Sequence, residues 1–156
     1  METTSVLVQS LLTQLTEVYE GEPWYGEPLT SKLNKIRQEA ASPSDLNKTA
    51  SYVQHLINWR KFVMEKFQGH AEFDFELNSK ADWTEIDLQQ FSDWDHLIAE
   101  LRVTQEELIQ LISHQNDDGL FLKVPGKNYT YAHMLHGLIQ HEVYHTGQIA
   151  VYWKNR

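Results

Sequence analysis

Gln140-His141-Glu142-Val143-Tyr144-His145-Thr146-Gly147-Gln148-Ile149 is the stretch around which the chain is organised. Its two histidines are four positions apart in a segment with helical periodicity. That spacing places both imidazoles on one face of a helix, within reach of a single metal ion. Residues 141–145 also match the H-E-x-x-H pattern of zinc peptidases. The segment therefore indicates a metal-binding helix, and the first question is whether it belongs to a peptidase.

A zinc peptidase of this kind needs a third metal ligand after the second histidine, either a histidine six positions on or an acidic residue further along. The position six beyond His145 is Val151, and none of the eleven residues after His145 is His, Asp or Glu. Glu142 lies about 100° round the helix from His141, so it need not face a metal. These observations argue against a peptidase, and a third ligand must come from upstream.

His55 is the best upstream candidate for that ligand. It lies in a helix predicted over residues 46–68, where apolar residues cover more than half of the circumference. A buried imidazole needs a partner for its nitrogen, and for His55 alone a hydrogen-bonded core histidine is the simpler interpretation. The need for a third ligand favours His55 as a ligand instead. Three neutral imidazoles would leave open positions for water or substrate and suit zinc, nickel, iron or copper.

The other histidines fit a shared metal site poorly. His136 falls on the far side of the last helix and His133 lies off to one flank. His70 and His96 stand at the two ends of a long connection, and we expect both to be solvated. An i,i+4 histidine pair can also arise by chance, so a bundle with a fortuitous histidine cluster stays open as an alternative.

The remaining periodicity predicts an all-α protein with one domain over residues 1–156. Gln105 is expected on the solvated face of the helix predicted over residues 91–115. Residues Leu120 to Val124 are expected to be extended. Trp24 and Tyr25 are expected to cover the end of the core or to line a pocket. Further helices are predicted over 4–20, 30–39 and 91–115, and from the N-cap Thr130 to about 153. Four long helices with a connection over residues 70–90 indicate a four-helix bundle with a long crossover.

Composition narrows the classes of function. The chain has 13 basic and 22 acidic residues, a formal net charge of -9, which argues against binding to nucleic acid or anionic membranes. It has no cysteine, so the protein itself supplies no thiol. No apolar run approaches a membrane span or a secretory signal, and we expect a cytoplasmic protein.

Taken together, these motifs resemble the DinB-like superfamily, which includes the YfiT-like and bacillithiol-transferase-like proteins. The similarity rests on H-x-x-Y-H-x-G-Q-I in the last helix, on Tyr52-x-x-His55-x-x-x-Trp59, on the connector at residues 20–26 and on the turn at residues 124–127. It covers essentially the whole chain. The family's name refers to damage-inducible expression and does not imply DNA binding.

The resemblance implies a four-helix bundle that binds a divalent metal, zinc or nickel, through His55, His141 and His145. It also implies a metal-dependent S-transferase that joins a low-molecular-weight thiol, such as bacillithiol or mycothiol, to an electrophile. A metal-dependent hydrolase and a non-catalytic metal-binding stress-response protein are the alternatives. Tyr144 and Gln148 are candidates for groups that support the ligands. The wide apolar surface of the helix at 46–68 leaves room for a homodimer.

Overall fold

Within residues 5–156, which the computed structural model describes, regular structure is helical apart from one isolated bridge between Lys123 and Thr130. The all-helical prediction is confirmed, and residue 4 of the first predicted helix lies outside the described range. The helices are α1 (Val6–Glu20), α2 (Leu29–Glu39), the 3₁₀ turn η1 (Pro43–Leu46), α3 (Asn47–Phe67), α4 (Phe91–Ser113), α5 (Asp117–Leu120) and α6 (Tyr131–Lys154).

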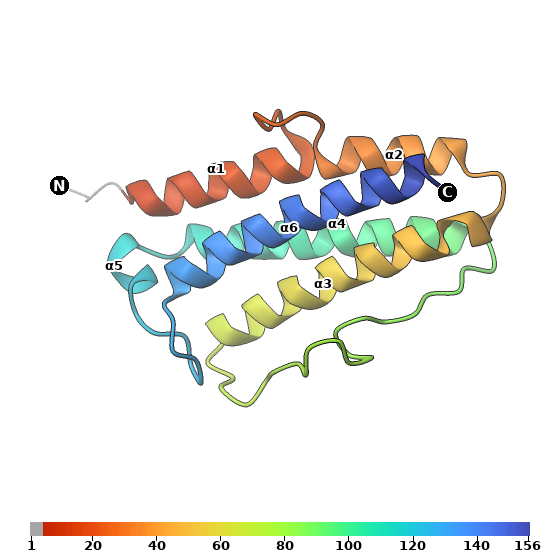
Figure 1. Cartoon of the computed structure of the whole chain (residues 1–156). Coiled ribbons are helices and arrows are strands. Elements are labelled where there is room, and N and C mark those ends of the chain that lie inside the picture. Colours follow the sequence, from red (N-terminus) through yellow and green to blue (C-terminus); the bar gives the residue numbers. More distant parts are fainter. Residues whose placement is uncertain (1–4) are drawn as a thin grey trace.

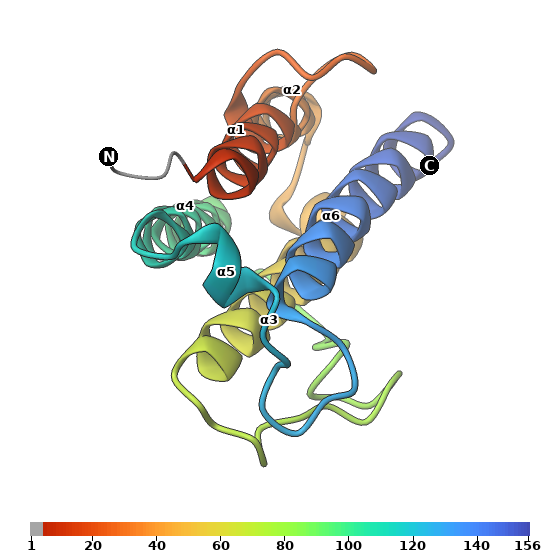
Figure 2. The ribbon, with the colours of Figure 1, turned by 90° about the vertical axis from the view of Figure 1, so that its left-hand side faces the viewer.

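Four long helices, α1, α3, α4 and α6, form the bundle (Figure 1). Both α4 and α6 pack against α1 on one side and against α3 on the other. The end-on view in Figure 2 shows the same ring of helices. Because α3 and α6 are antiparallel neighbours, side chains near the middle of one helix face side chains near the middle of the other.

The connection over residues 68–90 runs back along α3 and covers it (Figure 1). At its far end, Leu88 N donates to Asn47 Oδ1 (2.9 Å), which ties the connection to the start of α3. Most apolar side chains of α3 are buried within the same chain. The burial of these side chains gives the homodimer no support, and the homodimer stays a prediction.

Local signals explain where the helices begin and end. Thr130 caps α6 as predicted, because its Oγ1 accepts a hydrogen bond from His133 N (3.2 Å). Gly69 follows the end of α3 with φ +88, a conformation that glycine adopts without strain. The turn predicted at residues 42–45 is present as η1 with a capping box between Ser42 and Asp45.

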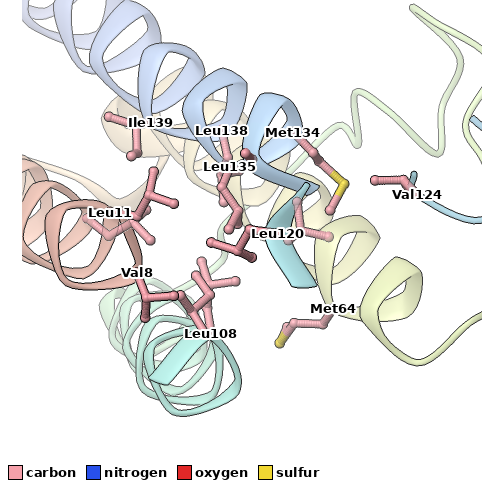
Figure 3. Close-up of a cluster of buried hydrophobic side chains, with 14 of the residues drawn as sticks. Val8, Leu11, Met64, Leu108, Leu120, Val124, Met134, Leu135, Leu138 and Ile139 are labelled. Carbon is pink, nitrogen blue, oxygen red and sulfur yellow. The ribbon is translucent and has the colours of Figure 1, made fainter. Parts of the chain in front are cut away.

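The core consists of two clusters of buried apolar side chains. One lies where α1, α4, α5 and α6 meet the C-terminal half of α3, and Figure 3 shows Leu11, Leu108, Leu120 and Leu135 pointing into it. The other joins α2, the N-terminal half of α3, α4 and the end of α6. Together they hold α3 and α6 at a fixed register, and this register positions the functional side chains.

Three local predictions need correction. Gln105 is buried and its Nε2 donates to Leu15 O (3.2 Å), because it lies one turn from Leu101 on the apolar face of α4. Leu120 is not extended, because residues 117–120 form the short helix α5, which Asn116 caps by accepting from Gly119 N; the rest of the predicted extended piece includes the bridge from Lys123 to Thr130. Trp24 is fully exposed, so it covers neither core nor pocket.

Candidate metal centre

The fold brings His55, His141 and His145 together in the middle of the α3–α6 contact. Nε2 of His55 lies 2.9 Å from Nε2 of His141 and 3.1 Å from Nε2 of His145. One ligand atom from each residue lies within 4.8 Å of the others. Two imidazole nitrogens roughly 2.1 Å from a common ion, at about a right angle, have this separation. The three histidines singled out from the sequence therefore form a group that can hold a metal ion.

His55 is held by the backbone and side chain of Asp82, a residue of the connection between α3 and α4. His55 Nδ1 lies 2.9 Å from the Asp82 carbonyl oxygen and 3.0 Å from Asp82 Oδ1. Both oxygens are acceptors, so Nδ1 carries the proton and the lone pair of the ring is on Nε2. The carboxylate is itself fixed by Trp59 Nε1, which donates to Oδ1 (2.9 Å), and by Asn78 N, which donates to Oδ2 (2.8 Å).

His145 is oriented by Gln148 in the same way. Its Nδ1 lies 2.6 Å from Gln148 Oε1, an acceptor, and Nε2 is left with the lone pair. This hydrogen bond supports the role expected of Gln148, which is to orient a ligand. Tyr144, the other residue expected to support the ligands, is exposed; its ring packs edge-on to His145 with centroids 5.1 Å apart.

The donor set fits a cation. The lone pairs of His55 and His145 face each other at 3.1 Å, and neither nitrogen has a proton to share. A metal ion that accepts both lone pairs removes this repulsion. His141 adds a third nitrogen, and its Nδ1 is buried without a partner among the described residues. Three imidazole nitrogens suit a transition metal better than calcium or magnesium.

Electrostatics keeps the three rings neutral. Burial, reinforced by the neighbouring His145 and His55, lowers the pKa of His141 to about 3. Burial also lowers the pKa of His55, against the opposing effect of Asp82, and the pKa of His145. A metal can bind only deprotonated imidazole, so ligands that are neutral at pH 7 bind it without releasing protons.

Aromatic rings enclose the histidines. The indole of Trp83 stacks flat on His55, with ring centroids 3.7 Å apart and planes 7° apart. Trp59 lies against His141 with centroids 5.7 Å apart. Tyr52 contacts both Trp83 (5.4 Å) and His145 (5.9 Å). These flat side chains restrict the positions that each imidazole can adopt and keep water from its faces.

Glu142, the central residue of the H-E-x-x-H match, forms a buried ion pair with Arg60. The pair is bidentate, from Arg60 Nε to Oε1 (2.5 Å) and from Nη2 to Oε2 (3.0 Å). Arg60 Nη1 also donates to Leu101 O (2.8 Å), so the pair joins α3, α4 and α6. The exposed fraction is 0% for Arg60 and 1% for Glu142. Glu142 is therefore committed to a structural contact, in agreement with its exclusion from a peptidase mechanism.

A cavity of about 640 Å³ opens beside the histidines. It follows the α3–α6 groove, and the connection over residues 77–83 forms one side. His133 lies at its edge, packed on Tyr129 with ring centroids 5.5 Å apart, and is not part of the ligand group. His136, His70 and His96 are exposed, as expected from the sequence.

Asp82, Trp83 and Arg60 belong to the surroundings of the site, but the sequence alone did not assign them to it. Asp82 and Trp83 lie in a connection without periodicity, where nothing marks a residue as buried. Arg60 did leave a signal, because it stands in the middle of the apolar face of α3, between Ile57 and Val63.

Comparison with known protein families agrees with the fold and the site. The model of the DinB superfamily matches residues 7–149, and the chain belongs to this superfamily. The resemblance seen in the sequence motifs is thereby confirmed. No protein of curated function and no solved structure matches the chain. None of the helices described for residues 5–156 is both long and apolar enough to cross a membrane.

Proposed function

We propose that the protein is a metal-dependent S-transferase that binds zinc or nickel through His55, His141 and His145 and joins a low-molecular-weight thiol to an electrophile. The convergence of three neutral imidazoles beside an open cavity carries the proposal. A closed structural site would need a fourth protein ligand, and no further Cys, Asp, Glu or His joins the group among residues 5–156.

A bound divalent metal would supply the positive charge that ionises a coordinated thiol near neutral pH. The chain's own residues hold that charge in place: Asp82 and Gln148 fix the rings of His55 and His145 from behind. Trp59 and Trp83 exclude water from one side of the ligands. Since the chain has no cysteine, the sulfur must come from a cosubstrate.

The reaction forms one bond and breaks another. The thiol loses its proton to solvent, and its sulfur forms a bond to the electrophilic carbon. The bond from that carbon to the leaving group breaks, and the leaving group takes the electron pair. With an epoxide, the leaving oxygen stays attached and takes up a proton. No oxidant or reductant is required.

Turnover with monochlorobimane and a panel of thiols tests the proposal. We expect product formation by the zinc- or nickel-loaded protein, and its loss in His141→Ala. His136→Ala, an exposed histidine on the same helix, is the matched control and should keep full activity. Metal retention without turnover of any thiol would contradict the transferase proposal and favour a non-catalytic metal-binding protein. Release of product from an ester or amide without thiol would favour a hydrolase instead.

Other expectations stay predictions. These are a homodimer, a cytoplasmic location, a stress-response role and the absence of nucleic-acid binding. The homodimer lacks support from α3, because most of its apolar side chains are packed in the core of the chain.

A further inference from the structure

The cavity beside the histidines is chemically divided. Because α3 and α6 are antiparallel, residues after His55 on α3 lie level with residues before His141 on α6. On this side the walls are largely apolar, and polar atoms come from Asn78, Tyr129 and His133. We call it the apolar half; its apolar lining residues on the two helices are Trp59, Phe62, Val63, Met134 and Leu138.

The other side, before His55 on α3 and after His145 on α6, has different chemistry. Lys48, Tyr52 and Gln148 line it, and we call it the polar half. Lys48 is exposed, and none of the carboxylates described in residues 5–156 forms an ion pair with its Nζ, although the chain carries an excess of acidic residues. Its Nζ lies over the ring of Tyr52, 5.3 Å from the ring centroid.

Gly137 shows that the apolar half is kept open. It lies inside α6, one turn before His141, where glycine weakens a helix relative to alanine. A Cβ built on Gly137 meets no atom within 4 Å, so no neighbouring group requires a glycine there. The residue lines the cavity, and its missing side chain leaves space directly beside the ligands.

We propose that the two halves bind the two substrates: an electrophile with an apolar body in the apolar half, and a thiol with a carboxylate or another anionic group at Lys48 in the polar half. This inference rests on the proposed transferase function. On α3, each half extends about seven residues of helix, roughly 10 Å, from His55. The sulfur and the electrophilic carbon would then meet at the histidines, where the halves join.

Binding of unreactive probes to the metal-loaded protein tests the division without turnover. The apolar probes are 1-alkanols from propanol to hexanol, titrated by saturation-transfer NMR. Their affinity should rise up to about fourfold per added methylene. Gly137→Leu should remove this gain, and Lys48→Gln should leave it unchanged. His136→Leu, which adds the same side chain to an exposed position of α6, is the control and should bind like the wild type.

The anionic probe is S-methylglutathione, compared with its diethyl ester, which lacks the carboxylate charges. We expect the wild type to bind the acid at least fivefold more tightly than the ester. Lys48→Gln should bring the two affinities together, whereas Gly137→Leu and the exposed control Lys123→Gln should not. If the Gly137→Leu variant does not bind metal or shows no cooperative thermal unfolding, Gly137→Ala is used in its place. We then expect a smaller loss of alkanol affinity.

The division would be overturned if alkanol affinity did not depend on chain length. It would also be overturned if Gly137→Leu and Lys48→Gln each weakened the binding of both probes equally. Equal affinity of the wild type for the acid and the ester would do the same. If the probes bind as expected but no thiol is turned over, the transferase proposal fails and the division of the cavity stands. If thiols are turned over but Gly137→Leu and Lys48→Gln do not each weaken only their own probe, the division of the cavity is overturned and the transferase proposal stands.

Discussion

Replacing Glu142 with glutamine should destabilise the protein strongly and leave its metal ligands in place. The Arg60–Glu142 pair is buried, with exposed fractions of 0% and 1%. Glutamine has nearly the same shape but offers a single acceptor oxygen and no charge, so the Arg60 guanidinium is left uncompensated. Breaking such a buried pair costs about 3–5 kcal/mol in the free energy of unfolding. For a domain of this size that is a fall in Tm of roughly 6–20 °C.

Thermal and urea unfolding followed by circular dichroism at 222 nm measure the effect, and metal content is measured below the transition. The matched control is Glu106→Gln, because Glu106 pairs with Arg102 at 3.7 Å on the exposed surface. Its cost should be under about 1 kcal/mol. The double variant Arg60→Met with Glu142→Leu should regain most of the lost stability, since an apolar replacement of a buried pair is often neutral or stabilising.

The reasoning fails if the free energy of unfolding of Glu142→Gln is within about 1 kcal/mol of the wild-type value while its turnover falls at least a hundredfold. That result would make Glu142 a proton-transferring residue, as the H-E-x-x-H pattern suggests, and the ion pair incidental.

Two further substitutions test the supports of the site and of the bundle. Asp82→Ala should weaken metal affinity roughly 10–100-fold in competition with a chromogenic chelator, because His55 loses its side-chain acceptor; Asp87→Ala, on the same connection, should leave that affinity unchanged. Gly126→Ala should lower the free energy of unfolding by at least about 1–2 kcal/mol in urea titrations, since Gly126 has φ +75 and a Cβ would lie 2.7 Å from Ala71 O. An unchanged urea midpoint for Gly126→Ala, or an unchanged chelator competition for Asp82→Ala, would contradict the contacts on which each rests.

Helical periodicity is enough to predict the four long helices and to pair His141 with His145. On α6 it set His141 and His145 on one face and His136 on another, and the structure agrees. His55 was found by a different route: the chain offered no ligand after His145, and His55 was the histidine embedded in an apolar helix. Both steps use local spacing and composition, which a single sequence contains.

Residues that are buried only because a distant partner exists were harder to predict. Arg60 and Glu142 are 82 positions apart, so no local spacing pairs one with the other. Each also stands in the middle of an apolar face, which is the signal that would have found the pair. Gln105 is a similar case. It lies between Leu101 and Leu108 on the apolar face of α4, but the sequence does not reveal its distant partner, Leu15 O. Asp82 left no such signal, because an irregular connection has no period to interrupt.

The metal content of untagged protein tests the central claim most directly. Elemental analysis of the wild type should find about one zinc or nickel ion per chain. His55→Ala and His141→Ala should each lose that ion, while His136→Ala should keep it. A wild-type protein that stays metal-free after exposure to zinc and nickel, or a metal that persists in both ligand variants, would contradict the three-histidine site.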